Sequence, residues 1–261
     1  MKKRITSLLL LIAVVIGALA SCAGGMTDSE ILAAADAELK SKAYYAVATT
    51  NLTTTSPLLA ERIEGISNAG ITYFVDGDDF TARMSTSVDG AEVERTYTVK
   101  DGVLYNESIA YIGGKHTVIR KKAELDSEKL SAAINELGAG AELNYLDFNS
   151  ITRDGSDTEC TITCTDVKSE SLDGAEEILG SVMLDGGYEL TLISCKLVME
   201  IKDGKYNSVS LTYNYSIEGD GDVYTVSATL KTVYNYSVAV SVPTPDNASD
   251  FTTVSYENAL K

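Results

Sequence analysis

Turn-forming dipeptides divide this chain into runs of strand-forming residues, and this pattern constrains its fold more than any other feature. Asp-Gly steps and a Gly-Gly step recur between these runs, among them Asp76-Gly77, Asp89-Gly90, Asp101-Gly102, Gly113-Gly114, Asp154-Gly155 and Asp203-Gly204. Such pairs favour type I′ turns, whose two central residues both take positive φ. The segments between the turns are rich in Val, Thr and Tyr. The sequence therefore predicts antiparallel hairpins joined into a meander.

The C-terminal third shows the clearest strands, because apolar and polar residues alternate there over long runs. The apolar positions of one parity are Val209, Leu211, Tyr213, Tyr215 and Ile217, then Tyr224, Val226, Ala228, Leu230, Tyr234, Tyr236, Val238 and Val240. Residues 193–201 repeat the pattern. Each strand should therefore carry one apolar face and one polar face. Pro243 and Pro245 end the pairing, which predicts a loosely packed tail over residues 243–261.

Three segments have helical spacing. Residues 28–42 follow the capping candidates Asp28 and Ser29, residues 127–137 start at Ser127, and residues 173–183 are shorter and weaker. Few helices among many antiparallel strands predict an α+β fold. We expect a single domain over residues 28–242, with a large curved sheet, an N-terminal helix and a mid-chain helical insertion.

The N-terminus has the layout of a secretory signal peptide. Lys2, Lys3 and Arg4 form a positive region, and residues 8–18 form an apolar run that small residues follow. A permanent membrane span needs about 20 apolar residues, so this run predicts export rather than a transmembrane helix.

The end of this signal, Leu19-Ala20-Ser21-Cys22, resembles the lipobox of bacterial lipoproteins. The resemblance implies that Cys22 receives a diacylglycerol and that a peptidase cuts just before it. Residues 1–21 would then be removed, residues 22–27 would form a tether, and the domain would sit on the extracytoplasmic face of the cell membrane. The alternative is an ordinary signal peptide with a chance cysteine near the cut.

The order of the expected elements resembles the LolA/LppX class of envelope lipid carriers. That class implies a half-barrel whose concave apolar face, covered by helices, holds acyl chains. The residues that we expect on the cavity wall are Leu211, Tyr213, Tyr215, Leu230, Tyr234 and Tyr236. Tyrosine suits an amphiphile, because it combines an apolar ring with a polar tip. The alternative is a filled core in a structural lipoprotein, or in one that interacts with a protein or a glycan.

The charge of the chain limits its partners. The net charge is −17, and loss of residues 1–21 removes three cations and no acid, which takes it to −20. Such a surface argues against nucleic acid and against electrostatic docking on anionic headgroups. We therefore expect the protein to meet the membrane only through Cys22. The other expected partner is a lipid or another apolar ligand. The protein should be a monomer.

The remaining cysteines do not suggest a metal site. Cys160 and Cys164 lie four residues apart in a predicted strand, about 13 Å, too far to form a disulfide. Either one can pair with Cys195, or all three can be free thiols. His116 is the only histidine, and the usual Cys-x-x-Cys spacing is missing, so we expect no metal.

No catalytic motif is present: there is no nucleophile elbow, no Walker loop and no dinucleotide fingerprint. His116 stands alone and should be an exposed hairpin residue. The acidic runs 76–79 and 218–222 fit turns rather than an EF-hand loop, and no carboxylate pair stands out by spacing. Residues 120–122 are expected to be a solvated strand end. The sequence therefore predicts a protein that is not an enzyme and needs no cofactor.

Overall fold

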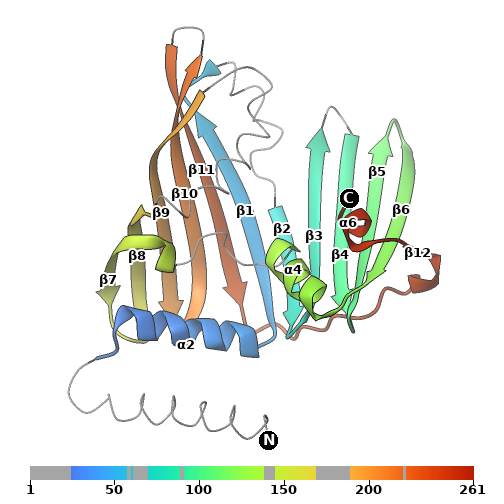
Figure 1. The fold of residues 1–261 in the computed structure, drawn as a ribbon, viewed down its shortest axis with the longest axis horizontal. Helices are drawn as coiled ribbons and strands as arrows, with labels where there is room; N and C mark the ends of the chain where they lie inside the picture. The colour runs from blue at the N-terminus through green and yellow to red at the C-terminus, as the bar shows by residue number, and fades with distance from the viewer. Residues whose placement is uncertain are drawn as a thin grey trace, which may run out of the picture.

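A single antiparallel sheet dominates the computed structural model, which describes residues 25–57, 60, 70–88, 91–137, 145–168, 189–219 and 222–261. The sheet has 12 strands in the order β12-β6-β5-β4-β3-β2-β1-β11-β10-β9-β8-β7. It is open rather than closed into a barrel (Figure 1). Apart from β12, every strand pairs antiparallel with its neighbours, as a meander of hairpins requires.

The strands fall into two runs that β1 and β11 join at the centre of the sheet. The first run comprises β1 (Tyr44–Thr54), β2 (Gly70–Asp76), β3 (Asp79–Val88), β4 (Ala91–Lys100), β5 (Val103–Ile112) and β6 (Lys115–Glu124). The second comprises β7 (Phe148–Gly155), β8 (Glu159–Val167), β9 (Glu189–Lys202), β10 (Lys205–Gly219) and β11 (Asp222–Asn235). Tyr45 of β1 lies opposite Asn235 of β11, so the end of the chain's last long strand meets the start of its first.

The predicted turns form the hairpin ends, with two local differences. Asp101 and Gly102 have φ of 51° and 76°, and Asp203 and Gly204 have φ of 52° and 71°, as type I′ turns require. At the first hairpin the turn is Gly77-Asp78, because Asp76 still belongs to β2. Gly155 ends β7 at φ 115°, where an added Cβ would lie 2.4 Å from the Glu159 carbonyl oxygen, so only glycine fits. Asp89-Gly90 lies outside the described residues.

Two of the predicted helices are present. The N-cap of helix α2 (Asp28–Ser41) is Thr27, one residue before the expected candidates: its side chain accepts from the Glu30 amide, and the Glu30 side chain accepts from the Thr27 amide in a capping box. It buries Ile31, Leu32 and Ala35, as its spacing predicts. Helix α4 (Ser127–Leu137) follows Asp126, whose side chain accepts from the Lys129 amide. The third predicted helix, residues 173–183, lies outside the described residues.

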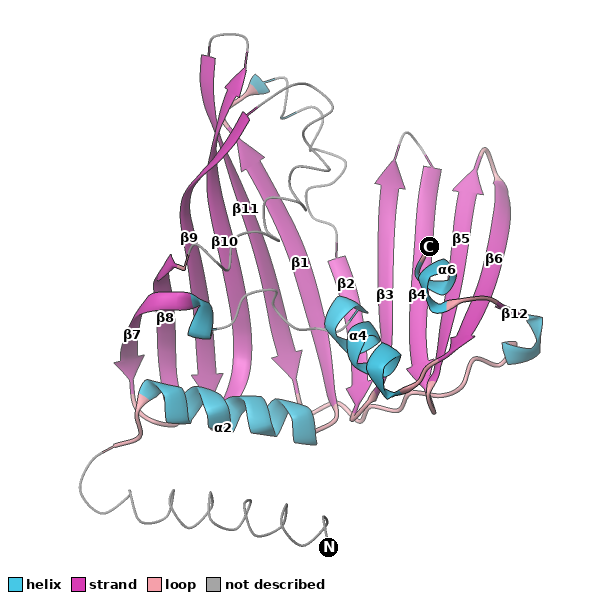
Figure 2. Ribbon diagram, in the orientation of Figure 1, coloured by secondary structure: helices cyan, strands magenta, loops and turns pink. Residues whose placement is uncertain are grey.

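The described helices that carry core residues, α2, α4 and the C-terminal α6 (Tyr256–Leu260), lie on one face of the sheet, which we call the inner face. Paired residues of neighbouring strands point to the same side, and the register places Ala46, Tyr73, Ala82, Tyr97 and Asn106 in one row across β1 to β5. In Figure 2, α2 crosses the lower ends of β9, β10 and β11, and α4 lies in front of β2. The opposite side, the outer face, carries Thr81, Thr96 and Thr98.

The last 19 residues, which we call the C-terminal clasp (residues 243–261), pack around the β6 edge of the sheet. Residues 243–247 and Phe251 lie over the outer face, and β12 (Thr252–Thr253) pairs in parallel with Lys121 and Lys122. A short 3-10 turn, η4 (Ala248–Asp250), precedes β12. Helix α6 (Tyr256–Leu260) then reaches the inner face, where the Asn106 Nδ2 donates to the Ala259 carbonyl at 2.7 Å. The expectation of a loosely packed tail is therefore wrong.

The fold class is the one that the sequence predicts. It is α+β, with a large open antiparallel sheet, an N-terminal helix and a helix between the two runs of strands. Among the described helices, none has the length and apolar character that a bilayer crossing demands.

Candidate functional site

The six residues predicted to line a cavity all belong to β10, β11 or the bend after β11. Register places Leu211 opposite Leu230 and Tyr213 opposite Ala228, so these side chains share the inner face. Leu211, Tyr213, Tyr215 and Tyr234 are buried, and Tyr236 is half-buried. Leu230 differs from them, since 41% of its surface is exposed. The wall is thus covered along most of its length and open at one apolar residue.

Tyr234 and Tyr236 lie at the α2 end of this wall, within a cluster of tyrosine rings. The Tyr44 ring lies 5.7 Å from Tyr234 and 6.0 Å from Tyr236, and the Tyr206 hydroxyl donates to Asp36 of α2 at 2.7 Å. Burial raises the pKa of Tyr44 to about 12, with a smaller contribution from Tyr73. Among the described residues, the buried Tyr236 hydroxyl has no hydrogen-bond partner. The rings therefore pack on one another, and the Tyr206–Asp36 hydrogen bond joins the cluster to α2.

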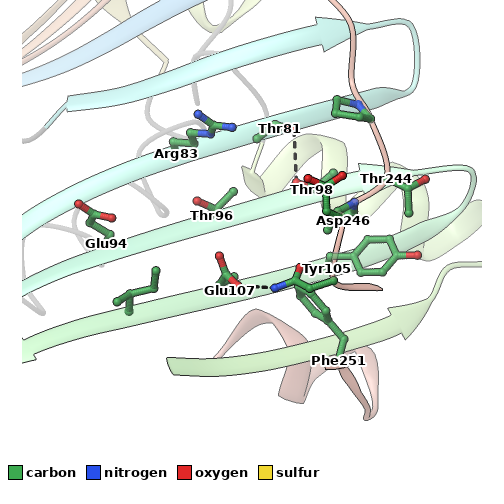
Figure 3. A pocket seen from close by; sticks show the side chains of 14 residues that line it. Thr81, Arg83, Glu94, Thr96, Thr98, Tyr105, Glu107, Thr244, Asp246 and Phe251 are labelled. Carbon is green, nitrogen blue, oxygen red and sulfur yellow. Dashed lines mark hydrogen bonds between the residues drawn. The ribbon is translucent and has the colours of Figure 1, made fainter. Parts of the chain in front are cut away.

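A second feature, which the sequence did not predict, is a cleft of mixed polar and apolar lining on the outer face of β3, β4 and β5 (Figure 3). Its volume is about 590 Å³, within the about 300–1,000 Å³ of small-molecule sites. The strands supply Thr81, Arg83, Glu94, Thr96, Thr98, Tyr105, Glu107 and Ile109, and the clasp supplies Pro243, Thr244, Pro245, Asp246, Asn247 and Phe251. We call this feature the outer cleft.

The clasp forms one side of the outer cleft and is fixed there by polar contacts. The Arg120 guanidinium pairs with Glu107. The Asn247 amide meets this ion pair: its Nδ2 lies 3.3 Å from Glu107 Oε2, and with the amide turned over its oxygen accepts from Arg120 Nε at 2.8 Å. Lys122 Nζ donates to the Ala248 carbonyl at 3.1 Å. The basic run 120–122 is therefore a docking site for the clasp rather than a solvated strand end.

An aromatic contact closes the clasp end of the outer cleft. The Phe251 ring meets the Tyr105 ring edge-on, with centroids 5.3 Å apart. At the other end, Arg83 and Glu94 are exposed and project from neighbouring strands (Figure 3). Along the sequence these outer-face residues read only as the polar half of an alternating strand. The missing signal was the clasp, because nothing local shows that residues 243–251 return to this face.

The other candidate residues occupy simpler positions. His116 is exposed on β6 beside the Gly113-Gly114 turn, as predicted. Cys160, Cys164 and Cys195 are buried free thiols. Of the two alternatives, free thiols are therefore correct, and neither Cys160 nor Cys164 forms a disulfide with Cys195. Burial raises the pKa of Cys164 to about 11 and that of Cys195 to about 12, so both thiols stay protonated at neutral pH.

Neither the lipidation site nor a metal site is visible in the structure. The lipobox residues Leu19, Ala20, Ser21 and Cys22 lie outside the described residues. Within the described ranges, no group of three or more His, Cys, Asp or Glu side chains is placed to hold a metal ion.

Comparisons with known proteins add little to this geometry. No family model matches the chain, and no curated protein matches it. Among solved structures, one match is an inactive mutant of the CurJ dehydratase in complex with a compound, at 9% identity and a TM-score of 0.14. The match covers 80% of this chain and 81% of the dehydratase chain.

One sequence-based expectation is corrected at this point. The chain was expected not to be an enzyme, whereas the matched structure is an enzyme domain and the outer cleft gathers Glu94, Glu107 and Asp246 on one surface. A TM-score of 0.14 assigns neither fold nor activity. The exclusion of catalysis is therefore withdrawn, and no activity takes its place.

Proposed function

We propose that this protein is a lipid-anchored lipoprotein of the extracytoplasmic membrane face that binds a lipid or another apolar ligand on the inner face of its sheet. The observation that carries the proposal is the exposure of Leu230 beside the buried Leu211, Tyr213 and Tyr215 of the same face. The proposed lipid anchor rests on the lipobox-like sequence Leu19-Ala20-Ser21-Cys22 at the end of the export signal.

Leu230 lies in the middle of β11, between Leu211 of β10 and Thr50 of β1. Leu211 is buried, and so are Tyr213 and Tyr215 further along β10. An acyl chain laid over Leu230 would remove this apolar surface from water, which contributes about 25 cal/mol for each Å² buried. The adjoining tyrosine rings supply apolar contact, and the Tyr236 hydroxyl supplies a polar group at the α2 end.

A second candidate function is a structural lipoprotein, or one that interacts with a protein or a glycan, with a filled core. The observation that favours it is the burial of Leu211, Tyr213, Tyr215 and Tyr234 by their own neighbours. The two candidates differ in one respect that can be measured, namely whether an apolar molecule binds at Leu230.

The test uses a matched pair of substitutions on β11. Leu230 and Val233 are exposed to similar extents, 41% and 45%, but they lie on opposite faces of the strand. We expect Leu230→Glu to weaken binding of a fluorescent fatty acid at least tenfold, because a buried carboxylate must then be desolvated. Val233→Glu introduces the same charge on the outer face and should leave binding unchanged.

Native mass spectrometry of protein extracted gently from membranes gives a second measurement. A lipid that copurifies with the parent protein and is lost from Leu230→Glu supports the proposal. If no fatty acid binds the parent protein, or if both variants bind it equally well, the filled-core alternative is favoured instead.

A further inference from the structure

We propose that the outer cleft is a binding site for a neutral saccharide. It lies on the face of the sheet opposite to Leu230, so this proposal does not depend on lipid binding at the inner face.

The floor of the outer cleft offers charged groups that are not engaged with each other. Among the described residues, Arg83 and Glu94 have no ion-pair partner, and the guanidinium of Arg83 lies 5.6 Å from the Phe74 ring centroid. A carboxylate accepts hydrogen bonds from hydroxyl groups, whereas a guanidinium donates them. Arg83 and Glu94 therefore match both the donor and the acceptor character of a sugar hydroxyl.

The walls of the outer cleft alternate hydroxyl groups with apolar surface. The hydroxyls of the buried Thr81 and Thr98 hydrogen-bond to each other at 3.3 Å, and the half-buried Thr96 adds a third hydroxyl to the lining. Pro243 and Ile109 supply apolar contact. A saccharide ring has the same division, with hydroxyl groups at its rim and C–H groups on its faces, so one ligand class satisfies both kinds of surface.

The charge of the lining selects against anions. Arg120 neutralises Glu107, so Glu94 and Asp246 stand against one unpaired cation of the lining, Arg83. The whole chain also carries a net charge of −17, so a phosphate or sulfate group would be repelled. A neutral polyhydroxylated ligand avoids this cost and can still form hydrogen bonds with Arg83 and Glu94.

The cleft is held in shape before any ligand arrives. Asn247 is fixed at the Arg120–Glu107 pair, Lys122 holds the Ala248 carbonyl, and Phe251 packs on Tyr105. A site that is already ordered loses less conformational entropy on binding than a loose one. The clasp thus gives the cleft a fixed side on an otherwise flat strand surface.

The experiment is isothermal titration calorimetry of the full mature domain with a panel of neutral oligosaccharides: malto-, cello-, manno-, xylo- and chito-oligosaccharides. Glu94→Gln and Arg83→Gln each remove one charged partner, and we expect each to weaken binding at least tenfold, because a hydrogen bond to a charged group is among the strongest. Glu92→Gln is the control. It makes the same change on the same face of β4, two residues outside the cleft, and should leave the affinity unchanged.

The proposal is overturned if no member of the panel binds the parent protein, or if Glu92→Gln weakens binding as much as Glu94→Gln. Binding of spermidine in place of every sugar would also overturn it, because the three carboxylates would then serve as a cation site. Neither outcome bears on lipid binding at Leu230.

Discussion

Five tyrosine rings gather at the α2 end of the inner face, and their ionisation is coupled to the stability of the fold: Tyr44, Tyr73, Tyr206, Tyr234 and Tyr236. Burial raises the pKa of Tyr44 and of Tyr73 to about 12, from an ordinary value of 10. The pKa of Tyr206 is also raised, first by burial and then by its hydrogen bond to Asp36. The hydroxyls of the folded protein therefore keep their protons at a pH where those of the unfolded chain lose them.

This coupling predicts a loss of stability in alkali. Below pH 10 both states keep the tyrosine protons, so the contribution is fully present. Between about pH 10 and 12 the unfolded chain releases the Tyr44 proton while the folded protein retains it, so the free energy of unfolding falls as pH rises. Tyr44→Phe removes one such group and should make this fall less steep by about 1.4 kcal/mol per pH unit. Urea unfolding at pH 9 to 12 measures the slope, and an equal slope in both proteins would contradict the prediction.

The sequence predicts which face of a strand each of these residues occupies, but not how deeply each one is buried. Alternation alone places Leu211, Tyr213, Tyr215, Tyr234 and Leu230 on one face, and the structure agrees. It does not distinguish buried Leu211 from exposed Leu230, although they are paired across β10 and β11. That difference depends on which elements cover each point of the sheet, and no local pattern encodes it.

At the scale of the elements, local chemistry determined what could be predicted. The Asp101-Gly102 and Asp203-Gly204 turns and the apolar stripe of α2 follow from short stretches of chain, and each is found where expected. The clasp is different. Its strand is two residues long and its helix five, too short for any periodicity, and its place depends on Phe251 meeting Tyr105 far back in the chain.

The clasp should therefore respond strongly to the loss of one ring. Phe251 is buried between the β6 edge and the outer face, and Phe251→Ala should lower the free energy of unfolding by about 3 kcal/mol. It should also speed proteolytic cleavage within residues 243–250, because the aromatic contact holds this segment down. Ile119→Ala on β6 is the control, since Ile119 is 51% exposed and should cost less than about 0.5 kcal/mol. Equal effects of the two substitutions would show that the clasp does not depend on the ring.

At the scale of the whole molecule, the two faces of the sheet divide the chemistry between them. The inner face collects the apolar and tyrosine side chains under the helices, and the outer face carries threonines and charged groups under the clasp. A net charge near −20 after removal of residues 1–21 would keep the domain away from anionic headgroups. A tether at Cys22 would then hold near the membrane a body whose charge alone would not bind there.

The anchor itself leads to the last prediction. If Cys22 carries two acyl chains, each buried methylene contributes about 0.8 kcal/mol, and the pair holds the protein stably on the bilayer. Cys22→Ala removes the thiol that accepts the lipid, so the protein should remain as an uncut precursor or appear in the medium. Cys195→Ala is the matched control, because it removes a buried free thiol far from the signal and should leave processing unchanged. Fractionation of cells, with mass spectrometry of the N-terminus, separates the outcomes. A Cys22→Ala protein that is still cut before residue 22 and still bound to the membrane would mean that the signal is of the ordinary kind and that another feature attaches the domain.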